Sequence, residues 1–217
     1  MDRQELAVIE GRWNPDLNIS VASTFDMLSD LLYGTPHGYF HHHFSNAQSL
    51  EHVIRHVASR QHLRFLYIGA HGNQTHIAGS LGSDDGKVTR SQLKNILWKI
   101  WSQGLGHFDG LFLGACGFAT NENAEMLLCG DKAPKSLKWV AGYAETIDWV
   151  DSSLLDVLFF RRVLAAAGSS PVERVKWAAR DLEALAPGLC AKLGFNVYIR
   201  KVGPNAGRPQ ITPLIRY

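Results

Sequence analysis

Cysteine is scarce in this sequence, which has only Cys116, Cys129 and Cys190 among its 217 residues. Three scattered cysteines are too few for a disulfide framework, and their spacing does not match a cysteine-based zinc site. The sequence therefore indicates a reducing compartment, in which a thiol stays available for chemistry.

Long apolar runs and an excess of one charge are also missing. No segment approaches the roughly 18 apolar residues of a membrane span. The charged start, residues 1–5, lacks the apolar stretch of a signal peptide. The 22 basic and 20 acidic residues are spread along the chain, without the basic stripe typical of nucleic-acid binding. We therefore expect a cytoplasmic protein that binds neither membranes nor nucleic acid.

Strand-like and helix-like segments alternate almost throughout the sequence. Short apolar or alternating runs predict strands, and apolar residues at three- and four-residue spacing predict amphipathic helices. The expected strands cover residues 6–9, 39–44, 65–69, 111–114, 138–142 and 195–199, and the expected helices 20–32, 50–57, 91–101, 121–128, 152–166 and 171–185. Ser91 and Ser170 are the expected helix caps, the second followed by Pro171 and by Glu173 as its reciprocal capping partner. Because no repeat or linker divides the chain, we expect one α/β domain over residues 1–217.

Two of the expected strands end in the same way. Residues 65–72 and 111–117 are each an apolar run followed by Gly-Ala-X-Gly, where X is His71 in the first and Cys116 in the second. Continuous apolar runs are typical of parallel strands covered on both faces. The carboxyl ends of neighbouring parallel strands share one edge of the sheet, where open α/β folds place their sites. We therefore expect an imidazole and a thiol at the same edge.

A histidine beside a cysteine is a recognised arrangement for nucleophilic catalysis. The imidazole accepts the thiol proton, and the thiolate attacks a carbonyl carbon. Backbone N–H groups of Gly72 and Cys116 are the expected oxyanion hole. The alternative is structural, because a cysteine after a buried strand is often a small core residue and a His-Gly pair is often a turn.

The pattern of an apolar strand with His71-Gly72 and a later apolar strand with Ala115-Cys116 resembles the caspase-like cysteine peptidases. This group includes caspases, metacaspases, legumain, clostripain, separase and the bacterial CHAT domains, and the segment 143–164 is most similar to the CHAT branch. The resemblance covers residues 6–186. It implies a three-layer sandwich with a mostly parallel central sheet flanked by helices, His71 as base, Cys116 as nucleophile, and no metal or organic cofactor.

The resemblance is incomplete at the cysteine. Gly114 stands where caspases have Gln, and Gly117 follows the nucleophile, so aspartate specificity is not implied. The family's primary pocket is lined by the segment corresponding to residues 145–151, which has three carboxylates and no basic residue. We therefore expect Glu145 and Asp148 to bind a basic substrate side chain. Alternatively, Asp151 caps the next helix and Glu145 is solvated.

The run His41-His42-His43 raises the question of a metal site. Consecutive strand residues point to opposite faces, so at most His41 and His43 share one face. With no Cys, Asp or Glu beside them in the sequence, we expect no metal there.

These observations predict a cysteine endopeptidase that cleaves a protein substrate. The resemblance adds activation by a partner protein, by self-cleavage or by dimerisation, in a bacterial regulated-proteolysis or defence setting. Two alternatives stay open: a catalytically silent interaction module of the same fold, and a cysteine hydrolase or transferase acting on a small acyl compound.

Overall fold

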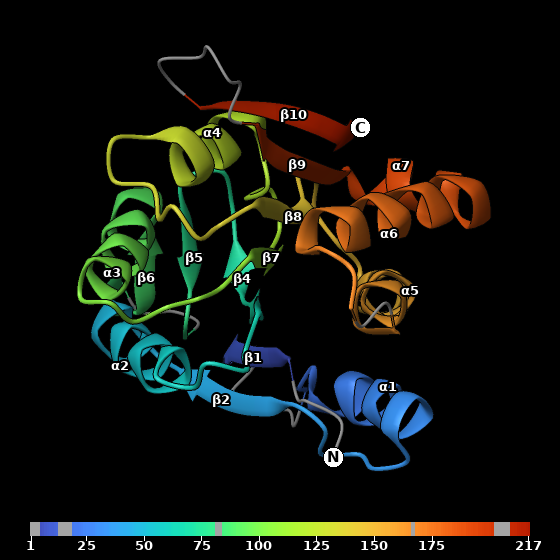
Figure 1. Cartoon of the computed structure of the whole chain (residues 1–217), viewed down its shortest axis with the longest axis horizontal. Coiled ribbons are helices and arrows are strands. Elements are labelled where there is room, and N and C mark those ends of the chain that lie inside the picture. Colours follow the sequence, from blue (N-terminus) through green and yellow to red (C-terminus); the bar gives the residue numbers. More distant parts are fainter. Residues whose placement is uncertain (1–4, 13–18, 81–83, 166–167, 202–208) are drawn as a thin grey trace.

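The computed structural model describes residues 5–12, 19–80, 84–165, 168–201 and 209–217. Its centre is a seven-stranded sheet in the order β10-β9-β8-β7-β3-β1-β2 (Figure 1). The strands are β1 (Leu6–Gly11), β2 (Phe40–Phe44), β3 (Phe65–Gly69), β7 (Gly110–Gly114), β8 (Trp139–Tyr143), β9 (Phe195–Lys201) and β10 (Gln210–Ile215). Adjacent pairs from β2 to β8 are parallel, and β9 runs antiparallel to both of its neighbours.

The middle of the sheet is buried on both faces. Every residue of β1, β3, β7 and β8 is buried, as expected of the continuous apolar runs that form them. Alternate residues of one strand enter different layers: Ala7 and Ile9 join one core cluster, and Leu6 and Val8 join the other.

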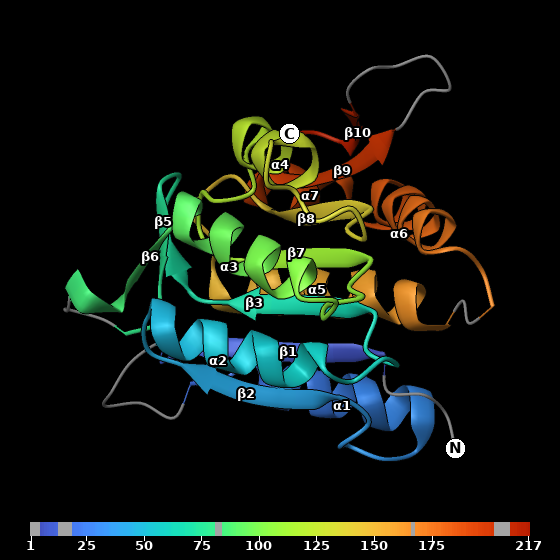
Figure 2. The same cartoon turned by 60° about the vertical axis from the view of Figure 1, so that its left-hand side comes forward.

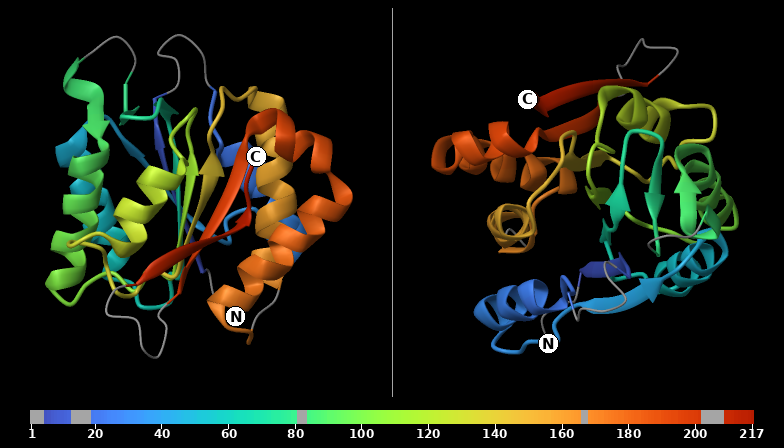
Figure 3. Two further views of the ribbon diagram at one scale, coloured as in Figure 1. Left: turned by 90° about the horizontal axis from the view of Figure 1, so that it is seen from above. Right: turned by 180° about the vertical axis from the view of Figure 1, so that it is seen from behind.

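Helices cover both faces (Figures 2 and 3). They are α1 (Ala22–Tyr33), α2 (Ala47–Ala58), α3 (Arg90–Ser102), α4 (Asn121–Cys129), α5 (Trp149–Ala165), α6 (Pro171–Leu185) and α7 (Pro187–Leu193). Buried residues of α2, α3 and α4 share one core cluster, and those of α1, α5, α6 and α7 share the other. The predicted three-layer α/β sandwich with a mostly parallel sheet is confirmed. None of the helices in the described residues is long and apolar enough to cross a membrane.

A small second sheet follows β3. It contains β4 (His71–Gly72), β5 (His76–Ala78) and β6 (Lys87–Thr89), with the short 3-10 turn η1 (Asp84–Gly86) before β6. β5 pairs antiparallel with both β4 and β6, so the segment after the histidine strand folds back on itself twice. The prediction of Ser91 as a cap was wrong. Thr89 caps α3 instead, because its hydroxyl accepts the N–H of Gln92 while the Gln92 side chain accepts the N–H of Thr89.

Three other differences lie in the second half of the chain. Helix α5 begins at Trp149, three residues before its predicted start, and α7 and β10 were not predicted. The sequence of β10 contains Pro213, which interrupts a ladder and is tolerated here because β10 is an edge strand. The predicted start of α6 is confirmed, since the Ser170 hydroxyl accepts the N–H of Glu173.

Candidate active site

His71 and Cys116 follow two neighbouring strands. β3 and β7 pair in parallel, with Gly69 opposite Gly114, so both chains leave the sheet at the same edge. His71 then begins β4, and Cys116 lies in the turn after β7. The sequence prediction that these two strands are parallel neighbours is confirmed.

The segments that carry the two residues are in direct contact. The N–H of Ala70 donates to the carbonyl oxygen of Gly114 at 3.1 Å, which extends the ladder beyond the strands. A Cβ atom added at Gly72 would lie 3.1 Å from the Ala115 Cβ and 3.2 Å from the Cys116 carbonyl oxygen. Glycine at position 72 therefore allows the histidine hairpin to pack against the cysteine turn.

Both side chains line one cavity of about 290 Å³. The cavity lies on the side of the sheet covered by α1 and α5, at the carboxyl ends of β3 and β7. Its apolar wall is formed by Ile19, Val21, Ile147 and Trp149, and its polar lining includes Tyr67, Ser152 and Asp156. The cavity therefore combines a half-buried thiol and a half-buried imidazole with apolar surface and one buried carboxyl group.

The cysteine turn is fixed by the segment after β8. The N–H of Ile147 donates to the Cys116 Sγ at 3.5 Å. The N–H of Gly117 donates to the carbonyl oxygen of Glu145 at 3.0 Å. Gly117 has a φ of +66°, a conformation that favours glycine. These contacts hold the thiol against the wall of the cavity.

The two amides predicted as an oxyanion hole have few competing acceptors. Asn73 donates its N–H to His76 across the β4–β5 hairpin, so the next pair, Gly72 with Ile77, occupies a non-hydrogen-bonded position. The N–H of Gly72 therefore points away from β5. Within the part of the chain that the structure describes, the N–H of Cys116 has no backbone acceptor.

Asp156 is a buried carboxyl group that the sequence analysis missed. Its Oδ2 accepts a hydrogen bond from the Tyr67 hydroxyl at 2.9 Å, and its Oδ1 accepts one from the Tyr143 hydroxyl at 2.6 Å. Burial raises the pKa of Asp156 to about 7, although the two phenol donors act in the opposite direction. Burial next to this carboxyl group also raises the pKa values of both tyrosines well above their ordinary value.

The sequence contains a signal for this residue. Asp156 follows Leu155 and Ser152 and precedes Phe159 at the spacing of a buried helical stripe, and all four side chains are buried. A carboxyl group at a core position of an amphipathic helix is costly unless it is hydrogen-bonded or used in binding.

The predicted substrate-binding residues Glu145 and Asp148 are not among the residues that line the cavity. Asp148 caps α5, because its Oδ1 accepts the N–H groups of Val150 at 2.9 Å and Asp151 at 3.1 Å. Glu145 is exposed and contributes its backbone carbonyl to the cysteine turn. The segment 145–151 does border the cavity, but through the side chains of Ile147 and Trp149.

The other two cysteines have different surroundings. Cys190 is buried, and burial raises its pKa to about 11. Cys129 is half-buried, and burial raises its pKa as well. Both groups are therefore poor candidates for a thiolate at neutral pH.

Asn123 connects the two halves of the site. This fully buried side chain donates from Nδ2 to the carbonyl oxygens of Gln74 at 3.0 Å and Phe118 at 2.8 Å. Gln74 belongs to the histidine hairpin and Phe118 to the cysteine turn, so one residue of α4 fixes both.

No protein-family model and no curated protein matches this sequence.

Proposed function

We propose that this chain is a cysteine endopeptidase of the caspase-like type. The observation that carries the proposal is the single cavity that His71 and Cys116 line together at the carboxyl edge of the sheet. The mostly parallel central sheet with helices on both faces is also the architecture that the resemblance implies.

In the proposed reaction Cys116 is the nucleophile and His71 the base. The imidazole accepts the thiol proton, and the sulfur forms a bond to the carbonyl carbon of the scissile peptide. The oxyanion of the tetrahedral intermediate accepts hydrogen bonds from the N–H groups of Gly72 and Cys116. The protonated imidazole then donates its proton to the leaving amine, and water hydrolyses the acyl-enzyme with the imidazole again as base.

We further propose that the residue before the scissile bond is basic and that Asp156 recognises it. A lysine or arginine side chain can pass along the apolar wall while its charged head reaches the carboxyl group. An incoming cation favours the ionised form of the carboxyl group, and charge-assisted hydrogen bonds follow. This assignment retains the expected basic specificity, with a carboxylate from α5 in place of Glu145 and Asp148.

Covalent labelling tests the proposal. The full-length chain is treated with thiol-directed peptidyl probes that end in arginine, lysine or norleucine, and the labelled residue is identified by mass spectrometry. We expect the wild-type chain to react fastest with a basic probe at Cys116. Cys116→Ala and His71→Ala should abolish labelling, and Cys129→Ala should have no effect because that thiol is outside the cavity. Asp156→Asn should remove the preference for arginine over norleucine.

Other results would contradict the proposal or favour one of the two alternative functions. Labelling that persists in Cys116→Ala would contradict the assignment of the nucleophile. Failure of the whole probe panel would favour the non-catalytic interaction module. Hydrolysis of small esters without cleavage of any peptide would favour the small-molecule acyl hydrolase.

A further inference from the structure

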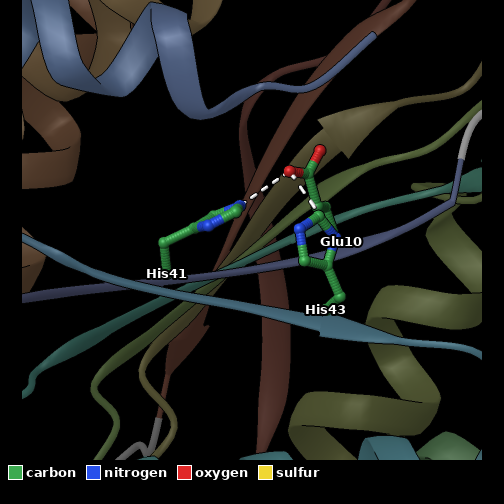
Figure 4. Close-up of side chains that lie close together, drawn as sticks. All are labelled: Glu10, His41 and His43. Atoms are coloured by element: carbon green, nitrogen blue, oxygen red, sulfur yellow. Dashed lines mark hydrogen bonds and ion pairs between the residues drawn. The ribbon is translucent and has the colours of Figure 1, made fainter. Parts of the chain in front are cut away.

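A second group of polar side chains lies on the neighbouring strands β1 and β2. It consists of Glu10, His41 and His43 (Figure 4). Glu10 pairs with His43, and Val8 pairs with His41, in the parallel ladder of β1 and β2. Because alternate residues of a strand share a face, both imidazoles and the carboxylate lie on the same side of the sheet. Glu10 is 31 residues before His41 in the sequence, and only the pairing of β1 with β2 brings its carboxylate to the two imidazoles.

The donor atoms of these three residues are close together. The Nε2 of His41 is 2.6 Å from the Glu10 Oε1, and the Nδ1 of His43 is 3.8 Å from the same oxygen. All three ligand atoms lie within 4.8 Å of one another. Ligands bound tetrahedrally at about 2.0–2.1 Å from zinc are roughly 3.3 Å apart. For one ion to lie between them, the His41 Nε2 must move about 0.7 Å away from the Glu10 Oε1 and the His43 Nδ1 about 0.5 Å toward it.

Burial and access also fit an ion site. The Glu10 side chain is fully buried, and its second oxygen accepts the N–H of Val21 at 3.0 Å. This bond fixes the carboxylate in place. The His43 side chain is 57% exposed, so an ion and a water ligand can enter from that side.

We propose that Glu10, His41 and His43 bind a divalent transition-metal ion, with zinc as the preferred ion and water as a fourth ligand. Two imidazoles and one carboxylate form a donor set that suits zinc, whereas calcium and magnesium prefer oxygen ligands only. The site is separate from the proposed catalytic dyad and does not depend on it. It is nevertheless close to the cavity, since Val21, which Glu10 holds, lines the cavity wall.

Zinc titration of the full-length chain tests the proposal. The measurement is made in a Cys116→Ala background, so that the thiol of the proposed dyad cannot bind the metal. Zinc affinity and stoichiometry come from competition with a chromophoric chelator, and cobalt is added separately to record its visible spectrum. We expect one ion per chain and a cobalt spectrum without a thiolate charge-transfer band.

The chain offers a matched control on the same strand. His42 points to the opposite face, where its ring lies 5.3 Å from that of His56 in α2. His41→Ala and His43→Ala should each weaken zinc binding by more than about 100-fold. Mutating a residue that only hydrogen-bonds to a metal ligand already lowers metal affinity by about 10- to 100-fold, and these variants remove a ligand itself. His42→Ala should leave the affinity unchanged. His41→Gln and His43→Gln, which keep a polar side chain, should show the same loss if an alanine variant fails to fold.

Three results would overturn the assignment. These are less than one ion bound per chain, equal affinity in the His41 and His42 variants, and a loss of binding confined to His42→Ala. The three residues would then form only a hydrogen-bonded network that holds the start of α1.

Discussion

At the scale of single residues, Asp156 is notable because its carboxyl group is buried and its pKa is strongly raised. Its carboxyl group is buried between two tyrosine hydroxyls and lines the proposed specificity pocket. A carboxyl group with a pKa of about 7 changes its charge near neutral pH, whereas an exposed aspartate is ionised throughout this range.

The first prediction concerns the pH dependence of stability. The pKa of Asp156 is raised from 3.8 to about 7 in the folded chain. The folded state therefore binds the proton more tightly than the unfolded state, and the stability it confers is fully present below pH 4 and is lost as the pH rises through about 7. Relative to Asp156→Asn, the wild-type free energy of unfolding should fall by roughly 4 kcal/mol across this window.

Urea denaturation of both proteins at several pH values between 4 and 8 gives this difference. Comparison with Asp156→Asn removes the contribution of the other titrating groups, which the two proteins share. Parallel stability curves for the two proteins would show that Asp156 has an ordinary pKa in the folded state.

At the scale of elements, the site is assembled from loops that are far apart in the sequence. β3 and β7 bring His71 and Cys116 to one edge, and α4 then fixes both loops through Asn123. Helix α5 adds Asp156 and Trp149 to the lining of the cavity.

The second prediction concerns Asn123 as a positioning residue. Asn123→Ala removes the side-chain donor of the Gln74 carbonyl group and one of the two donors of the Phe118 carbonyl group, which also accepts the N–H of Thr120. This loss should lower the free energy of unfolding by about 1–3 kcal/mol. The rate of Cys116 labelling should fall by about 10- to 100-fold, because the two loops lose their common support. Glu125→Ala, on the exposed side of the same helix, is the control and should change neither quantity. A loss of stability with an unchanged labelling rate would show that Asn123 is only structural.

The elements around the site were largely predictable from local sequence, and their side-chain contacts were not. The apolar runs at residues 65–69 and 111–114 and the helix signals between them indicated parallel neighbours, and the structure confirms this. Asp156 was missed because its partners Tyr67 and Tyr143 come from other elements, 89 and 13 residues away. Glu10 was missed for the same reason, since only the pairing of β1 with β2 brings it to His41 and His43.

At the scale of the whole molecule, the carboxyl ends and the amino ends of the parallel strands carry different groups of polar side chains. The cavity and the Glu10 cluster lie at the carboxyl edge of the parallel strands. At the opposite edge, Arg174 of α6 forms an ion pair with Glu5, which directly precedes β1. The two side chains are 6% and 14% exposed, so this pair is almost completely withdrawn from water.

The third prediction separates stability from chemistry by means of this ion pair. Arg174→Met keeps an unbranched apolar stem, removes the guanidinium group and leaves the Glu5 carboxylate unpaired in a nearly dry site. The free energy of unfolding should fall by about 3–5 kcal/mol, because a buried charge that loses its partner is strongly unfavourable. Lys87→Met removes an exposed ion pair with Asp84, should leave the free energy of unfolding nearly unchanged, and serves as the control.

The rate of Cys116 labelling under native conditions should be the same in Arg174→Met and in the wild-type chain, because the ion pair lies at the opposite edge of the sheet from the cavity. Glu5→Gln combined with Arg174→Met should recover part of the lost stability, since the unpaired charge is then absent. A labelling rate that fell together with the stability would mean that the two edges are coupled through the strands, and the carboxyl edge could not be treated as an independent site.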